Sequence, residues 1–414
     1  MKRRTPILST ALASLACAAA IAYAAPSLAA GSVNVGLSSS LTGPAAALGI
    51  ASKNAYELGI DEINAHGGLL GKQIKLLTAD GQLKPNTGVT NIRNFILADQ
   101  AKAIFTPVSS AVAIAEAGIA AQYKVPIFFA VSNDIELTGK KFSNYAFQVV
   151  PNTYMEPHAM ALYVASLFKK NHWKTLYTIA PNYAFGHSTV DQFLAGLKAD
   201  GVHVKVVGQQ WPQVGASDFT QYISAIMATK PDFVFAAEYG GDLITLTKQG
   251  QSAGLFQSTH FLGDYWPLAL KALGKDAPAG AITDDRAPPF YTIHTKAMEQ
   301  FANAYHARFH TWPGTWAILS YSSLQTWVDG VKKAGSFDGT KVADALSGGV
   351  TVDTVRGSFK LRACDHMAEI PVYLGTLSKD INPTYGRRVM SNVVVEPAQK
   401  IMMDCNTKVA MRHS

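Results

Sequence analysis

Charge and cysteine are both scarce in this chain of 414 residues. Charged residues make up 16% of the sequence and hydrophobic residues 48%, and Gly, Pro and Ser form no long tract. This composition excludes an intrinsically disordered protein, a collagen and a coiled coil. No basic stripe with interleaved aromatic residues is present, so the sequence does not favour nucleic-acid binding. The length favours two or three domains.

Long hydrophobic runs are also absent, except near the N-terminus. Lys2, Arg3 and Arg4 precede an Ala- and Leu-rich run, and the next charged residue is Lys53. Small residues at 27–30 then offer cleavage after Ala29 or after Ala30. We predict that residues 1–30 are a cleavable signal peptide and that the mature chain is exported. An uncleaved anchor and a lipoprotein site at Cys17 are the alternatives.

Removal of this leader changes both the charge and the cysteine count. The formal net charge falls from +7 to +4 because three basic residues are lost, and only Cys364 and Cys405 remain. In an oxidising compartment these two predict one disulfide, which closes a loop of about 40 residues and contributes about 3–4 kcal/mol. Two unpaired buried thiols are the alternative. No clustered His pair accompanies the cysteines, so we expect no metal site.

Two series of alternating strands and helices are predicted, the second beginning after Pro151. Such alternation is typical of parallel sheets that are covered on both faces and wound right-handed. The first series is predicted as strand 33–37, a helix from residue 48 that stops at Gly67, strand 74–78, helix 86–97, strand 103–105, helix 110–122 and strand 125–130. The second is predicted as helix 154–169, strand 175–180, helix 184–199, strand 203–207, helix 219–228, strand 233–236, helix 242–252 and strand 260–262.

After Gly280 the alternation ends. Two helical runs, 295–310 and 315–334, precede a strand-and-turn tail with both mature cysteines. We expect these helices to return to the first lobe, so that several crossings form a stiff hinge. The predicted fold is therefore α/β, with two doubly wound parallel-sheet lobes joined by a multi-strand hinge. The predicted segments are 31–149 and the return helices 284–350 for the first lobe, 150–283 for the second lobe, and 351–414 for the hinge strands and second-lobe tail.

Small polar and aromatic residues follow several predicted strands, where ligands of open α/β sheets bind. Ser109 and Ser110 lie at the start of helix 110–122, whose free N–H groups and positive dipole end favour a carboxylate. Capping of the helix without any ligand is the alternative. The remaining candidates for ligand binding are Ala130, Ser132, Asn133, Tyr183, Phe185, Tyr239, Asp264 and Tyr265.

Catalytic motifs are not found. The glycines at 67–71 before Lys72 depart from phosphate-loop spacing, and no nucleophile elbow is present. His306 and His310 lack the adjacent glutamate of a zinc helix, and Asp284 and Asp285 are interpreted as polar loop residues. We expect no catalytic residue, no cofactor and no enzymatic activity.

Several of these motifs together resemble a known family. They are the strand and turn at 33–44, the Asn-Ala-x-Gly-Gly-x-x-Gly turn within 61–72, the serine pair 109–110, the segment 136–138 and the Tyr-Ala-Phe-Gly run at 183–186. The sequence resembles the periplasmic solute-binding proteins of ABC importers, branched-chain amino acid class, with a type I periplasmic binding fold. The resemblance implies a monomer in the periplasm that delivers a small solute, an amino acid or aromatic carboxylate, to an ABC permease and its ATPase subunits.

The resemblance also implies roles for individual residues. Ser109, Ser110 and the segment 130–133 would hold the ligand's carboxylate, and Phe185 and Tyr239 would cover the ligand. Leu48 occupies a position that is often aromatic. The acid that meets an α-amino group has no clean match.

Either Asp264 or Tyr265 faces the cleft. If Asp264 reaches it, an amino acid is expected; if not, a ligand without an amino group fits better. A ligand-sensing protein of the same fold, serving a regulator or receptor, is the alternative function.

Overall fold

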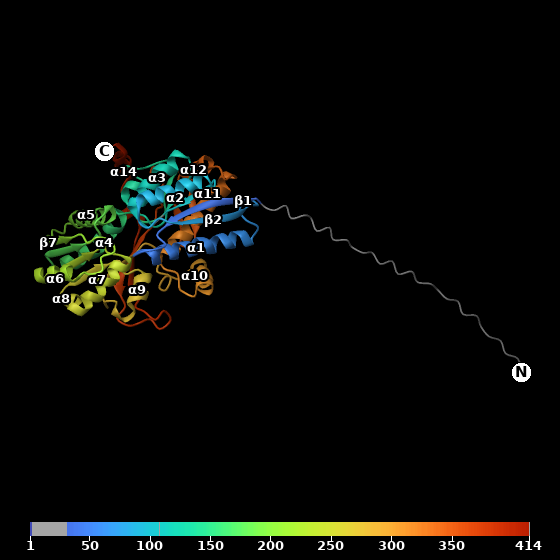
Figure 1. Ribbon diagram of the computed structural model, residues 1–414. Coiled ribbons are helices and arrows are strands. Elements are labelled where there is room, and N and C mark those ends of the chain that lie inside the picture. Colours follow the sequence, from blue (N-terminus) through green and yellow to red (C-terminus); the bar gives the residue numbers. More distant parts are fainter. Residues whose placement is uncertain (2–30, 107, 414) are drawn as a thin grey trace.

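The computed structural model describes Met1 and residues 31–106 and 108–413, which form two lobes of α/β structure. In Figure 1, helices α1 to α3, α11 and α12 surround one lobe, and helices α4 to α9 surround the other. The predicted leader, residues 2–30, lies outside the described residues. Within the described part of the chain, no helix combines the length and the hydropathy needed to cross a bilayer.

The first lobe is built on a five-stranded parallel sheet with strand order β2-β1-β3-β4-β5. Its central strands are buried on both faces, so their sequences are continuously apolar rather than alternating. Val35, Phe105 and Phe128, one on each of three strands, are fully buried. Its strands are β1 (Ser32–Ser39), β2 (Gln73–Asp80), β3 (Ile104–Phe105), β4 (Ile127–Phe129) and β5 (Ala146–Gln148), and its first helices are α1 (Ala46–Ala65), α2 (Pro85–Leu97) and α3 (Ser110–Gln122), with the 3-10 turn η1 (Ile135–Leu137) after β4.

The second lobe holds a seven-stranded sheet with strand order β14-β13-β10-β9-β8-β6-β7. Five strands are parallel, but β13 and β14 pair antiparallel at one edge, so the predicted parallel lobe is confirmed with this difference. Its strands are β6 (Thr175–Ile179), β7 (Lys205–Gln210), β8 (Phe233–Ala236), β9 (His260–Gly263), β10 (Ile282–Asp285), β13 (Val372–Leu377) and β14 (Met390–Glu396). Its helices are α4 (Met155–Asn171), α5 (Ala184–Ala199), α6 (Thr220–Thr229), α7 (Gly240–Ala253), α8 (Leu255–Ser258) and α9 (Pro267–Leu273), with the 3-10 turn η2 (Gly274–Asp276).

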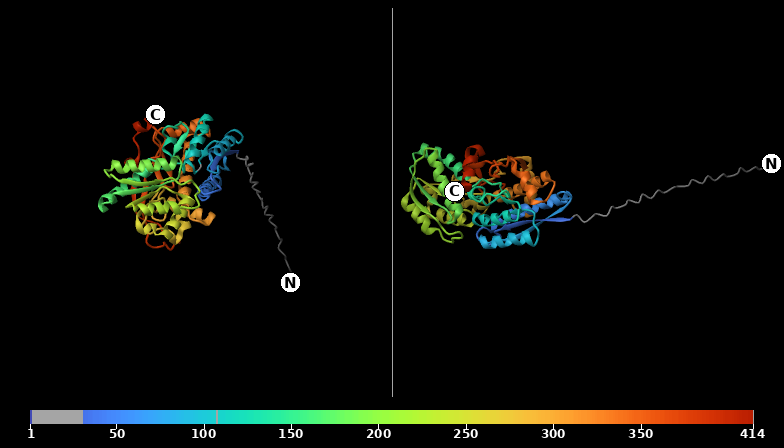
Figure 2. Two further views of the ribbon diagram at one scale, coloured as in Figure 1. Left: turned by 60° about the vertical axis from the view of Figure 1, so that its left-hand side comes forward. Right: turned by 90° about the horizontal axis from the view of Figure 1, so that it is seen from above.

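Helices that follow the second lobe in sequence pack on the first lobe. Helix α11 lies against α1, where Gly59 permits close approach: a methyl group placed there would be 2.7 Å from Leu324 Cδ2. Trp327 of α11 is fully buried and meets the ring of Phe105 edge-on, with centroids 6.4 Å apart. Figure 2 shows these late helices, in orange, beside the blue N-terminal elements. The returning elements are α10 (Lys296–Phe309), α11 (Thr315–Ala334), α12 (Gly339–Ser347), β11 (Thr351–Thr354) and β12 (Gly357–Lys360).

Three segments, 149–154, 286–295 and 361–371, cross between the lobes. The third crossing is bonded to the edge of β5, because Gln148 N donates to His366 O (3.1 Å) and Ala368 N donates to Gln148 O (2.9 Å). Arg356, just before the third crossing, donates from Nη1 to Val149 O (3.2 Å) on the first. The first and third crossings are therefore connected at the hinge.

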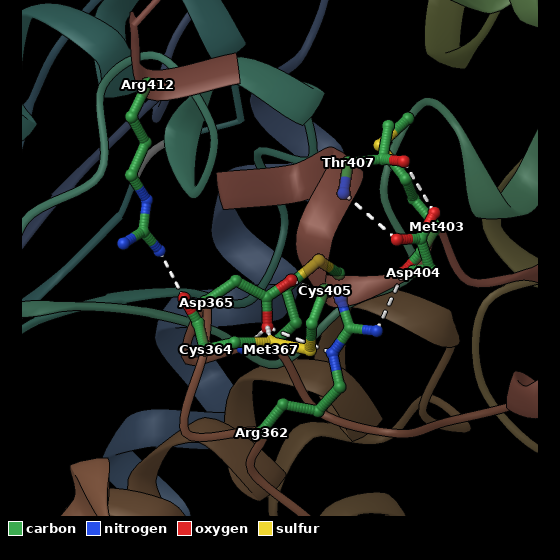
Figure 3. The surroundings of a disulfide bond; sticks show 9 residues. All are labelled: Arg362, Cys364, Asp365, Met367, Met403, Asp404, Cys405, Thr407 and Arg412. Atoms are coloured by element: carbon green, nitrogen blue, oxygen red, sulfur yellow. Dashed lines mark hydrogen bonds and ion pairs between the residues drawn. A yellow bond between two sulfur atoms is a disulfide. The ribbon is translucent and has the colours of Figure 1, made fainter. Parts of the chain in front are cut away.

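The C-terminal residues contain two short helices, α13 (Ala398–Ile401) and α14 (Cys405–Ala410), and the 3-10 turn η3 (Met411–His413). The predicted disulfide between Cys364 and Cys405 is confirmed, and it links α14 to the third crossing (Figure 3).

Trp327 is expected to be the main contributor to the first lobe's core. Replacing Trp327 with Ala leaves a cavity beneath α11 and should lower the free energy of unfolding by about 3–5 kcal/mol. Urea denaturation measures this. The control is Leu97→Ala, at a side chain that is 57% exposed, which should change stability by no more than about 0.5 kcal/mol. Equal losses in both variants would contradict the packing described.

Candidate functional site

A small cavity lies between the two lobes, beyond the carboxyl ends of strands from both sheets. Its side chains leave about 10 Å³ open to water, roughly the space of one water molecule, so a ligand enters only when the lobes move apart. The first lobe, the second lobe and the second crossing all contribute to its wall. The lining residues are Val108, Ser110, Val131, Asn133 and Trp316 from the first lobe, Tyr183, Phe185, Tyr239 and Trp266 from the second, and Arg286.

The start of helix α3 forms the polar end of the first-lobe wall. Ser109 is the N-cap residue, yet its side chain makes no capping hydrogen bond, and Ser110 begins the helix. The free N–H groups of this first turn and the helix dipole favour an anion. Ser110 lines the cavity, whereas Ser109 and Ser132 lie beside it, joined by a bond from Ser132 Oγ to Ser109 O (3.3 Å).

Residues after β4 continue this wall. Asn133 lines the cavity, and Ala130 is buried but lies outside the lining. The Asn133 Nδ2 group donates to Pro151 O (3.1 Å) on the first crossing and to Glu156 Oε2 (3.2 Å) on α4. Asn133 therefore connects the cavity wall of one lobe to the hinge and to the other lobe.

Three aromatic residues of the second lobe cover the opposite side. The hydroxyls of Tyr183 and Tyr239 are hydrogen-bonded (2.9 Å), and Phe185 meets the Tyr239 ring edge-on at 5.8 Å between centroids. Burial raises the pKa of both tyrosines well above the ordinary value, so both stay neutral. The sequence predicted all three residues near the ligand, and the structure brings them together at the cavity.

Arg286 is a cavity residue that the sequence analysis did not identify. It follows β10, and its guanidinium lies 4.5 Å from the ring centre of Trp266 and 5.6 Å from that of Trp316. Its Nε donates to Glu156 Oε1 at 2.5 Å, and both side chains are nearly inaccessible, at 2% and 1% exposed. Although burial opposes the charge, Glu156 and neighbouring acids raise the pKa of Arg286.

Three carboxyl groups surround this arginine. Beside Glu156, the side chains of Asp264 and Asp284 are buried, and burial together with mutual repulsion raises both pKa values well above the ordinary range. One cation cannot balance three carboxylates, so Asp264 and Asp284 are held largely protonated.

The structure corrects the interpretation of Asp284 and Asp285 as polar loop residues. Both belong to β10, inside the second sheet, and are buried. Asp285 Oδ1 accepts hydrogen bonds from Ala287 N (3.0 Å) and Thr315 Oγ1 (2.8 Å), which compensates for its burial. The adjacent charged residues Asp284, Asp285 and Arg286 do not match the apolar pattern of a buried strand, so the sequence did not predict β10.

Neither Asp264 nor Tyr265 lines the cavity. Asp264 lies in the acid cluster, and the Tyr265 hydroxyl is 3.2 Å from Thr247 Oγ1 in the core of the second lobe. The next residue, Trp266, provides the cavity wall instead. Among the described residues that line the cavity, none is acidic.

The two lobes touch at the mouth of the cavity. A methyl group placed on Gly241 would lie 3.5 Å from the carbonyl oxygen of Pro44, and one on Gly240 would lie 3.6 Å from Leu48 Cδ1. Pro44 and Leu48 belong to the first lobe and the glycines begin α7 of the second. The lobes are therefore closed over the cavity.

Comparison with known proteins gives consistent results. A family model described as "Periplasmic binding protein" matches residues 32–381. The Leu/Ile/Val-binding protein BraC3 of Rhizobium johnstonii is 28% identical over 332 residues, 78% of this chain and 86% of that protein. A periplasmic binding protein from Burkholderia mallei matches with a TM-score of 0.81 at 22% identity, covering 91% of this chain and 98% of that one. A solute-binding protein of an ABC transporter from Rhodopseudomonas palustris, solved with 3,4-dihydroxybenzoic acid, matches with a TM-score of 0.77 at 22% identity. The match covers 88% of this chain and 98% of that one.

Asp285 provides a pH test of the buried cluster. Burial raises its pKa from 3.8 to about 7. Between these values the unfolded chain releases the proton while the folded protein keeps it, so stability falls as pH rises. Relative to Asp285→Asn, the wild type should lose up to about 4 kcal/mol between pH 4 and 7.

Thermal unfolding as a function of pH measures this difference. Asp276→Asn, at an exposed position on η2, is the control. A constant difference between wild type and Asp285→Asn over this range would contradict the raised pKa.

Proposed function

The chain belongs to the periplasmic binding protein family, and from that premise we propose that it binds a small aromatic carboxylic acid without an α-amino group between its two lobes. It then serves as the solute-binding component of an ABC importer.

This proposal rests on the kinds of side chain that form the cavity wall. The wall contains a guanidinium, a hydroxyl at a helix start and a side-chain amide, but no acidic group among its described residues. The indole N–H groups of Trp266 and Trp316 are buried without a partner in the described structure, so both remain available as donors. A carboxylate finds donors in the Ser110 hydroxyl, the N–H groups at the start of α3 and the two indoles, whereas an ammonium group finds no counterion.

The aromatic lining suits a planar ring. Tyr183, Phe185 and Tyr239 of the second lobe and Trp316 of the first approach the space from two sides. Aromatic rings pack against one another edge-on or offset, with favourable energies beyond their burial. The solved relative with bound 3,4-dihydroxybenzoic acid supports this assignment.

Ligand binding and lobe closure are coupled in this proposal. Ser110 and Asn133 belong to the first lobe and Tyr239 and Trp266 to the second, so a ligand makes all its contacts only when the lobes are closed. A ligand that binds the closed state better shifts the population towards it. The closed form presents both lobes in a fixed relation to a membrane permease.

An aliphatic amino acid is the second candidate. It is favoured by the names of relatives such as the Leu/Ile/Val-binding protein of R. johnstonii. It requires a carboxylate at the ligand's amino group, but Glu156 is already paired with Arg286. Glu238 precedes the lining residue Tyr239, and Asp264 lies two residues before the lining residue Trp266. Burial and neighbouring acids raise the pKa of both, so neither is a ready counterion.

The cellular setting follows from the same family. We propose that the mature protein acts in the periplasm after removal of residues 1–30, as a monomer, with an ABC permease and its ATPase subunits as partners. The basic N-terminus and the apolar run that follows it support export.

A ligand panel tests the solute class. Benzoate and 3,4-dihydroxybenzoate should raise the melting temperature, because a ligand at 100 times its Kd stabilises the native state by about 2.7 kcal/mol. Leucine, isoleucine and valine should have little effect at equal concentration. Stabilisation by the amino acids alone would assign the protein to the second candidate.

Ser110 is expected to contact the carboxylate. Replacing Ser110 with Ala should weaken binding of a stabilising acid by about 1–3 kcal/mol, since a buried hydrogen-bond partner is lost. Ser109→Ala should have a smaller effect because Ser109 lies outside the lining. Calorimetric titration measures both, with Ser166→Ala on the exposed side of α4 as control. An unchanged affinity in Ser110→Ala would remove this residue from the site.

A further inference from the structure

The C-terminal segment, residues 398–413, contacts both lobes. It follows β14, the last strand of the second sheet. Helix α13 packs on α4 of the second lobe through the buried residues Ala398 and Ile401. Three residues later, α14 lies against the first lobe, where Lys408 Nζ donates to Ile135 O at 2.7 Å.

Lys408 makes this contact from a buried position. Its side chain is almost completely buried, with 1% of the residue exposed. Burial lowers the pKa of Lys408 to about 8, while Asp365 and Asp134 favour its charged form. Movement of α14 away from the first lobe breaks the hydrogen bond to Ile135 and uncovers the buried Lys408 side chain.

Covalent and polar contacts fix the same helix to the hinge. Figure 3 shows Cys405 bonded to Cys364, with Arg362 and Arg412 reaching the main chain on either side. Arg362 Nη1 donates to Met403 O at 2.8 Å, and Arg412 donates to Cys364 O. The Arg412 guanidinium also lies over the Phe142 ring of the first lobe, 3.4 Å from its centre.

The loop that carries Cys364 is itself part of the first-lobe edge. It is paired with β5 through the two bonds between Gln148 and residues 366 and 368. The disulfide therefore joins α14 to the first lobe, whereas α13 stays with the second.

We propose that residues 398–413 are a disulfide-anchored strap that forms a fourth connection between the lobes and restrains their opening. Only Met402, Met403 and Asp404 separate the two anchored helices. A chain of three residues spans roughly 10 Å when fully extended, so it offers little slack. Opening the lobes further detaches either α13 from α4 or Lys408 from Ile135.

The strap lies beyond the residues that the family model matches. The family match ends at residue 381, so this segment and Cys405 lie beyond it. The restraint on lobe motion adds to that of the three crossings, and it acts whichever solute is bound.

Distance measurements between the lobes, made without any solute, test this proposal. Spin labels on cysteines introduced at Arg93 of α2 and Ser224 of α6, both exposed, report the inter-lobe distance by pulsed electron resonance. Two variants loosen the strap: Cys364→Ser with Cys405→Ser, and Lys408→Met, which keeps the disulfide. Lys400→Met is the control, because the Lys400 side chain is 65% exposed on α13.

We expect both loosened variants to show a broader distribution with a larger fraction of long distances, and the control to match the wild type. Circular dichroism verifies that each variant is folded, and Lys408→Met provides the test if the double serine variant does not fold. A lower melting temperature with an unchanged distance distribution would show that the strap stabilises the fold without restraining lobe motion, and it would overturn the proposal. Equal broadening in Lys400→Met would overturn it as well. Because no solute is used, the result is independent of the proposed function.

Discussion

The ion pair between Glu156 and Arg286 holds the two lobes and the hinge in one network. Arg286 comes from the second crossing, and Glu156 comes from α4 just after the first crossing. Removing two charges from water costs several kcal/mol per ion unless other contacts compensate. Asn133 supplies a hydrogen bond to Glu156 from the first lobe, and the rings of Trp266 and Trp316 face the guanidinium from both lobes. The pair is therefore fully compensated only while the lobes are closed.

This dependence links the hinge to the cavity. Asn133, Trp266 and Trp316 each line the cavity and each contact the ion pair. A solute that orders these side chains also completes the surroundings of Arg286, so ligand contacts and closure stabilise each other. The aromatic faces add cation–π attraction, which strengthens when water is excluded. Specificity and closure are thus properties of the same set of residues.

Much of the fold was predictable because it rests on local periodicity. Helix α3 and strand β8 were predicted with their observed bounds, since the periodicity of helices and the apolar runs of buried strands are short-range signals. The disulfide was predictable because export left two cysteines.

The missed parts depend on long-range packing. Strand β10 contains two adjacent aspartates, a pattern that is typical of a loop. Only the folded structure shows that Thr315 and Arg286 lie beside them and allow their burial. Trp316 was placed on a predicted helix, but only the return of that helix to the first lobe brings it to the cavity. The sequence predicted Tyr183, Phe185, Tyr239, Ser110 and Asn133 as site residues from strand ends, and it could not identify Arg286.

The electrostatics of Arg286 also limit how a carboxylate can bind. Its charge is already matched by Glu156, so a second anion gains less from it than from an unpaired arginine. The start of α3, with Ser110 and free N–H groups, is the stronger anion site because its donors have no competing counterion there. Arg286 then contributes a positive charge to the wall, where the rings of Trp266, Trp316 and Phe185 already pack around its guanidinium. In the proposed function, an ammonium group in the same place meets the guanidinium at close range without an acid in the wall, and this repulsion disfavours amino acids relative to aromatic acids.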